Sequence, residues 1–131
     1  MLARYSMVRG TPASELPEGI RQDTRRHTHH VLHPEPALVD AFLEDTADEA
    51  KWRAFRTGYR ALLERRFAAD REPFDALAEL ARASDVYLGC SCPTKKNPDV
   101  RRCHTSLALA FMKERYPDLD VRMPHATGQA R

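Results

Sequence analysis

The chain has 131 residues, a length that normally folds as one domain around a single core, so we expect one domain over 1–131. Hydrophobic residues make up 42% and charged residues 31%, a globular composition that excludes a disordered or fibrous protein, and the net charge of +2 is too small for the whole chain to be a polyanion binder. No apolar run approaches the ~20 residues of a membrane helix. We therefore expect a cytoplasmic protein with no membrane partner.

The first third of the chain is poor in regular patterns. Residues 2–8 (LARYSMV) alternate loosely between apolar and polar side chains and predict a first strand. Residues 9–35 predict a long irregular connection, because turn-forming residues are scattered among polar ones: Gly10, Pro12, Pro17, Gly19 and Pro34. At the other end of the chain, residues 124–131 predict a loose tail.

The middle of the chain predicts three helices. Residues 36–43 form a short apolar segment with Pro36 in its first turn, where the missing N–H costs little. Thr46 and Glu49 have the spacing of a capping box, which predicts a helix over about 47–68. Its apolar stripe recurs every three or four residues: Trp52, Phe55, Tyr59, Leu62, Leu63 and Phe67. A second amphipathic helix begins at Pro73, with one apolar side made of Phe74, Leu77, Ala78 and Ala81.

The last third alternates between strand and helix patterns. Residues 85–90 (DVYLGC) predict a buried strand, 106–116 a helix, and 119–123 a last strand. This order predicts an α/β fold, a small single domain with a short, mostly parallel sheet flanked by helices. Ligands of such folds bind at the carboxyl ends of the strands, which is where residues 90–104 would lie.

All three cysteines lie in this segment, together with one histidine: Cys90, Cys92, Cys103 and His104. A reducing cytoplasm keeps cysteines as thiols, so metal binding or thiol reactivity explains the clustering better than a disulfide. Four such side chains are the ligand set of a closed zinc site. The spacings C-x-C and C-H differ, however, from the paired knuckles of structural zinc sites. In this alternative the chain is a zinc-binding interaction module that contacts nucleic acid.

The leading interpretation is a thiol-based or ligand-binding site. Cys103 would stand at a helix N-terminus, where the partial positive charge favours a thiolate, and His104 could take or give a proton. We therefore assign Cys103 and His104 as candidate catalytic residues. Three arginines are assigned to binding a small anionic ligand: Arg60, Arg101 and Arg102. The plainer alternative is that the cysteines are small buried apolar side chains.

Two weaker signals lie outside this segment. The histidines between His27 and His33 (HTHHVLH) include a pair at i and i+4, but no cysteine or carboxylate is close in sequence, so a solvated loop is favoured over a metal site. Arginines on the 47–68 helix could contact nucleic acid phosphates, although neighbouring acidic residues dilute them.

Three runs resemble a known family when they are taken together in chain order. They are WRAFRTGYRALL, ALAELARASDVYLGC and RRCHTSLALAFM. They resemble the bacterial and archaeal family called domain of unknown function 488 (DUF488), and most of all its short YeaO-like members. The resemblance covers about 36–116 and implies a small α/β domain, with Cys90 at a strand end and Cys103 with His104 at a CHR-type helix start. It implies no activity, because the family is named for lacking one.

The chain departs from the family pattern at two places. Thr105 stands where the family often has Arg, which weakens the argument that the helix start binds a phosphate. The run C-S-C-P replaces an acidic beginning of the loop and adds Cys92. The added thiol favours a metal or redox role, and the N-terminal third matches the family pattern poorly.

Overall fold

The structure is a computed structural model of the chain, and it describes residues 1–124. Its elements form a small α/β domain of the predicted class, with a three-stranded parallel sheet. The strands are β1 (Leu2–Ser6), β2 (Ile20–Asp23) and β3 (Val86–Cys90). The helices are α1 (Pro36–Leu43), α2 (Glu49–Ala69), α3 (Glu72–Ala83) and α4 (His104–Arg115), with short 3-10 turns η1 (Ala13–Glu15) and η2 (Val100–Arg102).

The sheet brings three chain segments to one edge. β3 lies in the centre and pairs in parallel with β1 on one side and β2 on the other. Its register sets Ser6 beside Cys90 and Asp23 beside Gly89. The segments that follow the three strands therefore all start at the same edge of the sheet.

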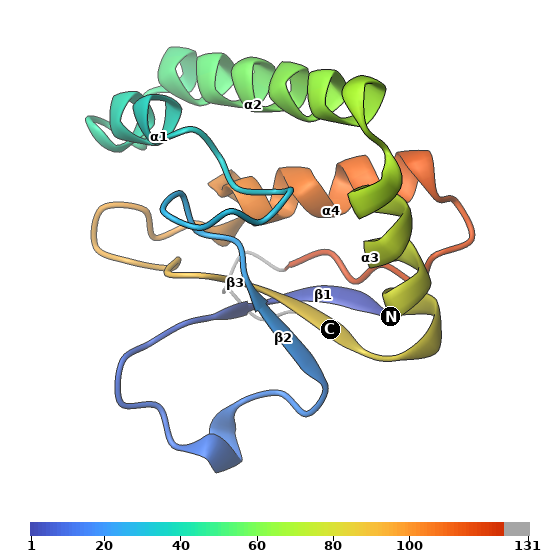
Figure 1. Cartoon of the computed structure of the whole chain (residues 1–131). Helices are drawn as coiled ribbons and strands as arrows, with labels where there is room; N and C mark the ends of the chain where they lie inside the picture. Colours follow the sequence, from blue (N-terminus) through green and yellow to red (C-terminus); the bar gives the residue numbers. More distant parts are fainter. Residues whose placement is uncertain (125–131) are drawn as a thin grey trace.

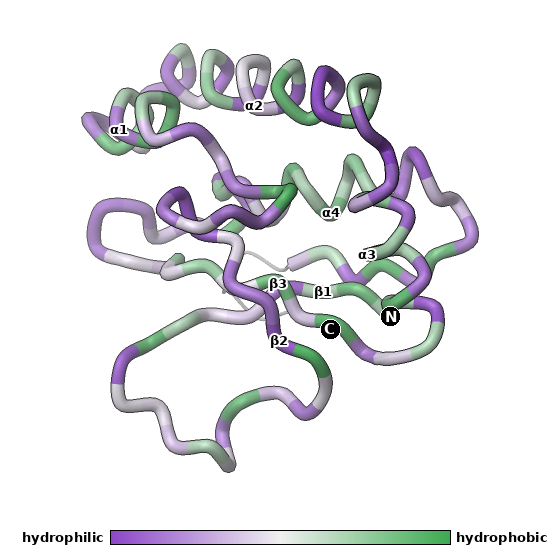
Figure 2. The backbone as a smooth tube through the Cα atoms, in the orientation of Figure 1, coloured by the Kyte–Doolittle hydropathy of each residue, from purple (hydrophilic) through white to green (hydrophobic). Residues whose placement is uncertain are grey.

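The helices stack in layers over the sheet (Figure 1). α4 packs on β1 and β3, α2 packs on α4, and α1 packs on α2. The α2 stripe predicted from the sequence points inward, because Phe55, Tyr59 and Leu63 are buried. Hydrophobic residues concentrate in α4 and in the strands beneath it, whereas the turns of α2 alternate between hydrophobic and hydrophilic (Figure 2). Burial of this apolar surface supplies the main favourable free energy of folding.

The start of α2 differs from the prediction. The cap is Asp48, whose side chain accepts hydrogen bonds from the N–H groups of Ala50 and Lys51, so the predicted capping box of Thr46 and Glu49 is wrong. The Thr46 hydroxyl instead donates to the carbonyl of Lys96, in the loop that follows β3. Competing local acceptors are common just before a helix, and here the aspartate is two residues closer to the first turn than Thr46.

The prediction of an irregular connection over 9–35 is also wrong in part, because β2 lies within it. Residues after β2 are firmly held. The Tyr59 hydroxyl donates to the carbonyl of Leu32, and Arg66 donates to the carbonyls of Val31 and His33 at 2.7 Å. This segment therefore forms a fixed wall beside the carboxyl end of the sheet.

Near the C-terminus, α4 begins at His104, two residues before the predicted helix start. The strand predicted over 119–123 is wrong, since only a single bridge joins Val121 to Leu2. The predicted loose tail lies outside the described residues from 125 onward. No helix within residues 1–124 has the length and apolar character to cross a bilayer.

Candidate functional site

The three cysteines come together at the carboxyl edge of the sheet. Cys90 is the last residue of β3, and Cys103 is the N-terminal cap of α4. Cys92 follows β3 in the loop, and its peptide bond to Pro93 is cis. The Sγ atoms of Cys90 and Cys103 are 3.2 Å apart, and all three sulfurs lie within 4.8 Å of one another. Among the described residues, these three free thiols are close enough to hold a metal ion.

The ring of His104 faces two of these sulfurs. Its Nδ1 atom lies 3.7 Å from the Sγ of Cys103 and 3.9 Å from the Sγ of Cys90. The ring is buried against Tyr59, whose ring meets it edge to face at 5.9 Å between centroids. The structure thus gathers the whole predicted set of Cys90, Cys92, Cys103 and His104 in one place.

Thr24 fixes which nitrogen of His104 faces the sulfurs. This buried residue follows β2, and its hydroxyl donates to the carbonyl of Gly89 at 3.0 Å. A hydroxyl has one proton, so its oxygen must accept the hydrogen bond from the Nε2 atom of His104 at 2.8 Å. The Nε2 atom is therefore protonated, and Nδ1 is left to interact with the thiols.

Two further side chains donate to the sulfurs. The Asn97 amide donates to the Sγ of Cys92 at 3.3 Å and to the carbonyl of Arg102 at 2.7 Å. The Thr105 hydroxyl donates to the Sγ of Cys103 at 3.4 Å. Donors of this kind stabilise a thiolate more than a thiol.

Arg4 connects β1 to the same site. Its side chain is buried, and its Nε donates to the Thr105 hydroxyl at 3.1 Å. One of its terminal nitrogens donates to the carbonyl of Cys92 at 2.6 Å, and the Ser6 hydroxyl donates to the same carbonyl. A buried guanidinium thus holds both the loop that carries Cys92 and the first turn of α4.

The three thiols differ in the direction of their pKa shifts. Hydrogen bonds from the Cys90 and Cys92 thiols, together with the nearby His104 ring, hold the pKa of Cys103 well below its usual range. Interaction with the Cys103 thiolate raises the pKa of Cys92 to about 12 and that of Cys90 well above its usual value. Burial alone would lower the pKa of His104, but the Cys103 thiolate outweighs it and raises that pKa to about 10. These directions favour a Cys103 thiolate beside a protonated His104 ring when no metal is bound.

A cavity of about 280 Å³ opens beside these groups, and Cys90, Cys92, Cys103 and His104 all line it. Its apolar wall comes from α1, α2 and the segment before them: Pro34, Val39, Phe42, Leu43 and Phe55. The remaining lining is polar and comes from the loops after β2 and β3: Arg25, Arg26, His27, Ser91, Thr94, Asn97 and Arg102. Its size is close to the lower end of small-molecule pockets.

The three arginines assigned to ligand binding are placed differently. Arg102 lines the cavity, and its guanidinium pairs with Glu49 and lies 5.8 Å from the centre of the Trp52 ring. Arg101 is exposed outside the cavity and pairs with Asp99. Arg60 lies on the other side of α2, where it pairs with glutamates of α2 and α4. Of the three, the structure brings only Arg102 to the cysteines.

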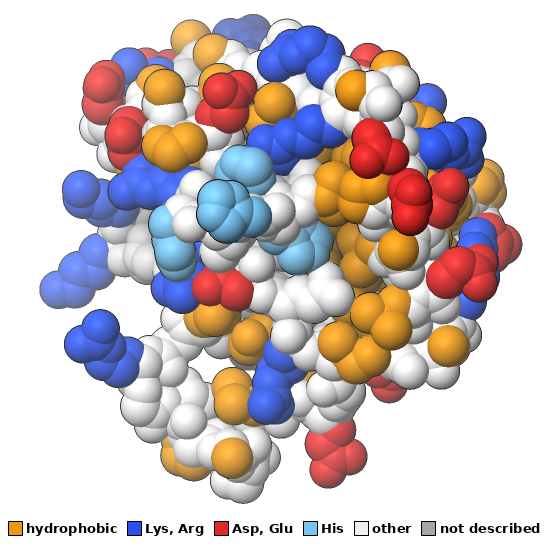
Figure 3. Space-filling model, in the orientation of Figure 1, with side chains coloured by type: hydrophobic (Ala, Val, Ile, Leu, Met, Phe, Trp, Pro, Cys, Tyr) orange, Lys and Arg blue, Asp and Glu red, His pale blue; other side chains and the backbone are white. Residues whose placement is uncertain are grey.

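The histidines between 27 and 33 are not arranged as a metal site. Both ring nitrogens of His30 are used within the protein: Nδ1 accepts from the N–H of Leu32 at 3.0 Å, and Nε2 donates to Gln22 at 2.6 Å. The ring of His33 lies between the carbonyl of His30 and the Arg66 side chain. His27 lines the cavity, and His29 is exposed. Histidine side chains gather on this face over the segment that follows β2 (Figure 3).

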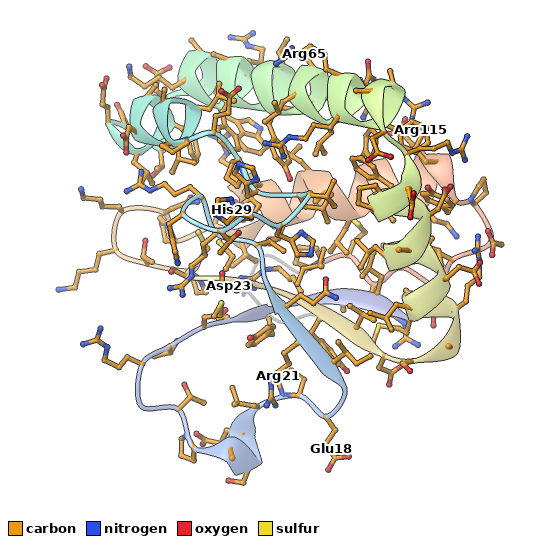
Figure 4. All side chains as sticks on the ribbon, viewed as in Figure 1. Glu18, Arg21, Asp23, His29, Arg65 and Arg115 are labelled. Atoms are coloured by element: carbon orange, nitrogen blue, oxygen red, sulfur yellow. The ribbon has the colours of Figure 1, made fainter. Side chains whose placement is uncertain are left out.

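Figure 4 shows that the charged outer face of α2 lies apart from the carboxyl ends of the strands. Asp23 lies at the end of β2, below the loop that carries His29. The Arg65 side chain projects from the outer face of α2, and Arg115 lies at the far end of α4. The charged outer surface of α2 therefore belongs to another region of the molecule than the cysteine site.

Sequence reasoning missed three residues that hold the site: Arg4, Thr24 and Asn97. One signal could have found Thr24. Had IRQD been recognised as a strand, the next residue would have been placed at the carboxyl edge beside the end of β3. The contacts of Arg4 and Asn97 have no local signal in the sequence.

Comparison with known proteins agrees with the motif order. A family model described as the active DUF488-N3 subclade (DUF488-N3a) matches residues 5–116. The match includes most of the N-terminal third, which corrects the prediction that this third fits the family poorly. Assignment to the YeaO-like short members stays a prediction. Searches of the curated proteins and of the solved structures found no match. The family match covers most of the sequence and both ends of the cysteine site, and the chain therefore belongs to the DUF488 family.

Proposed function

We propose that the chain is a thiol-based DUF488 protein in which the Cys103 thiolate attacks an electrophilic atom of a small anionic molecule bound in the adjoining cavity, and the displaced group takes a proton from the Nδ1 atom of His104. The observation that carries this proposal is the arrangement of Cys103. This residue lines the cavity, and its Sγ receives a hydrogen bond from Thr105 and faces the Nδ1 atom of a histidine whose other nitrogen is fixed by Thr24. A nucleophile, a base and an orienting group are the parts that such chemistry requires.

Each residue has a definite role in this proposal. Cys103 is the nucleophile, and the helix N-terminus that it caps favours its thiolate. His104 is the charge partner of the thiolate and delivers or removes a proton at Nδ1. Thr24 is a positioning residue, because it acts only through His104. The description of the matched subclade as active also supports a chemical role over a purely structural one.

The cavity lining supports an anionic ligand. Arg25, Arg26 and Arg102 contribute to the wall, whereas their acidic partners Asp23, Asp40 and Glu49 do not line it. The Oδ1 atom of Asn97 is buried without a hydrogen-bond partner among the described residues, and it could accept an N–H or O–H of the ligand. The apolar wall with Phe42 and Phe55 would contact an uncharged part of the same molecule.

The test is the rate at which each cysteine reacts with an alkylating agent in chelator-treated, reduced protein. Trypsin cuts after Arg102 and Lys113, so Cys103 lies alone on one peptide, whereas Cys90 and Cys92 share another. We expect brief treatment with iodoacetamide at neutral pH to modify the Cys103 peptide first, as judged by mass spectrometry. Faster modification of the Cys90 and Cys92 peptide would refute Cys103 as the nucleophile.

The anion preference has its own matched control. Iodoacetate carries a negative charge and iodoacetamide does not, so their rate ratio at Cys103, relative to a free thiol, reports the charge of the cavity. We expect Arg102→Ala to lower this ratio about fivefold, the effect of ~1 kcal/mol for a partly exposed charge. Arg101→Ala should leave it unchanged, because that side chain lies outside the cavity. Equal effects of the two substitutions would contradict a role for Arg102 in anion binding.

The sequence also led us to predict a zinc-stabilised module that contacts nucleic acid, and a basic surface on α2. The nucleic acid contact stays a prediction. Its measurement is affinity for short DNA and RNA against salt concentration, because phosphate contacts make affinity fall steeply as salt rises.

A further inference from the structure

The three sulfurs are arranged more tightly than a nucleophile alone requires. A reactive Cys103 needs a base and a charge partner, and His104 supplies both. Cys92 adds a third sulfur within 4.8 Å of the other two. Three sulfur atoms converging in a largely buried site are the ligands that zinc and other thiophilic metals prefer.

His104 supplies a fourth ligand atom. Its Nδ1 faces the sulfurs of Cys90 and Cys103, and its Nε2–H donates to Thr24. Metal-binding histidines usually donate their other ring N–H to a fixed acceptor, which sets the tautomer and the ring orientation. Thr24 is such an acceptor, because its own proton is committed to the carbonyl of Gly89.

Like Thr24, two further side chains form hydrogen bonds to the proposed ligands, in this case to the sulfurs. The Asn97 amide points at the Sγ of Cys92, and the Thr105 hydroxyl points at the Sγ of Cys103. The same two side chains tie the loop to the start of α4, since Asn97 also donates to the carbonyl of Arg102, and Arg4 donates to Thr105. The sulfurs are thus held close together by the fold itself.

From this geometry we infer that Cys90, Cys92, Cys103 and the Nδ1 atom of His104 form a four-ligand site for a zinc ion. Cys92 serves only the metal, whereas Cys103 and His104 serve both the metal and the thiol chemistry. A zinc ion held by all four ligands occupies the Cys103 thiolate, so metal loading and alkylation of Cys103 exclude each other. The inference goes beyond the proposed function and does not rest on it, because chelated protein can react as a thiol whether or not the site binds zinc.

The first experiment uses cobalt as a spectroscopic substitute for zinc. Co²⁺ added to chelator-treated, reduced full-length protein should give sulfur-to-cobalt charge-transfer absorption and the visible bands of a tetrahedral ion, and zinc should displace it at about one ion per chain. Cys92→Ser should weaken cobalt binding by about 100-fold or more, since even outer-layer changes cost 10–100-fold. Ser91→Ala is the matched control, because Ser91 lines the same cavity without being a proposed ligand.

The second experiment separates this inference from the proposed function. Saturating zinc should slow alkylation of Cys103 at least about tenfold, and a chelator should restore the rate. Zinc should also raise the unfolding temperature of the wild type but not of Cys92→Ser, a comparison that holds if the variant folds without metal. Thr24→Val should weaken cobalt binding about tenfold through His104.

Three results would overturn the inference. They are the absence of cobalt absorption, unchanged cobalt affinity in Cys92→Ser, and alkylation of Cys103 that saturating zinc does not slow. Unchanged affinity in Thr24→Val would remove His104 from the ligand set. None of these results would bear on the reactivity of Cys103 in chelator-treated protein. The zinc site and the proposed thiol function can therefore be refuted independently.

Discussion

The half-buried His30 and the buried His104 are connected in different ways, although each has a nitrogen that donates to a side-chain oxygen. In His30 the second nitrogen accepts a hydrogen bond from the backbone N–H of Leu32, so the ring is fully used by the fold. In His104 the second nitrogen faces the sulfurs of Cys90 and Cys103. A histidine whose two ring nitrogens are both hydrogen-bonded within the fold has no nitrogen available for a reaction or a ligand. His104 has one such nitrogen, which faces the thiols.

The hydrogen-bond partners of a histidine therefore indicate its role better than the number of histidines near it in the sequence. The run from His27 to His33 has the denser pattern, but both ring nitrogens of His30 are hydrogen-bonded within the wall after β2. His104 is isolated in sequence among histidines and is the one that meets the cysteines. Substitution of each ring and a change of pH should distinguish His104 from His30.

The largest effect should come from replacing His104. In His104→Gln the Cys103 sulfur loses the cation 3.7 Å away, and a free thiol is only a few per cent ionised at neutral pH. We expect alkylation of Cys103 at pH 7 to slow at least about 30-fold, as measured by mass spectrometry of the tryptic peptide. His30→Gln should change the rate less than about twofold. Similar slowing in both variants would contradict the conclusion that His104, and not His30, supports the Cys103 thiolate.

The next prediction concerns His30 and pH. Burial lowers the pKa of His30 from 6.5 to about 4, so the unfolded chain binds a proton more readily than the folded one. The stability that the neutral ring contributes is complete above pH 6.5 and is lost as the pH falls toward 4. We expect a loss of about 2 kcal/mol over this range, after allowing for partial exposure of the ring.

Urea unfolding of the wild type and of His30→Gln at several pH values measures this loss. The variant should show a shallower fall in the free energy of unfolding between pH 6.5 and 4, whatever its stability at pH 7. The slope is the informative quantity, because the substitution also changes packing. Equal slopes would show that the His30 ring is already accessible to protons in the folded state.

The smallest effect should come from Thr24. Thr24→Val keeps the shape of the side chain but leaves the Nε2–H of His104 without its acceptor, so alkylation of Cys103 should slow about tenfold. Thr24→Ser restores the hydroxyl and should recover most of the rate. A positioning role requires this rescue, because a loss of packing alone would be worse in the smaller serine. Slow reaction in both variants would therefore contradict it.

The sequence predicted the parts of the site that depend on element order. A strand ending at Cys90 and a helix beginning near Cys103 follow from short-range patterns, and in a parallel sheet those two ends must meet at one edge. Helix α1 was placed at its observed bounds, because Pro36 marks its first turn. The meeting of the cysteines was therefore within reach of the sequence.

Other parts of the fold and of the site depend on long-range contacts, which no local sequence pattern indicates. β2 has one apolar residue in IRQD, since it is an edge strand with little to bury, so its pattern resembled a loop. Thr24 and His104 are separated by 80 positions, and only the completed sheet joins them. Arg60 was predicted to bind an anionic ligand, but its turn of α2 directs its side chain toward Glu114.

The buried Arg4 extends the cysteine site to the beginning of the chain. Its guanidinium, carried on β1, reaches the hydroxyl of Thr105 across a separation of 101 positions, and it also reaches the carbonyl of Cys92. A side chain from the start of the chain thus holds both the loop and the helix start that carry the cysteines. A search confined to the residues around Cys103 would overlook it.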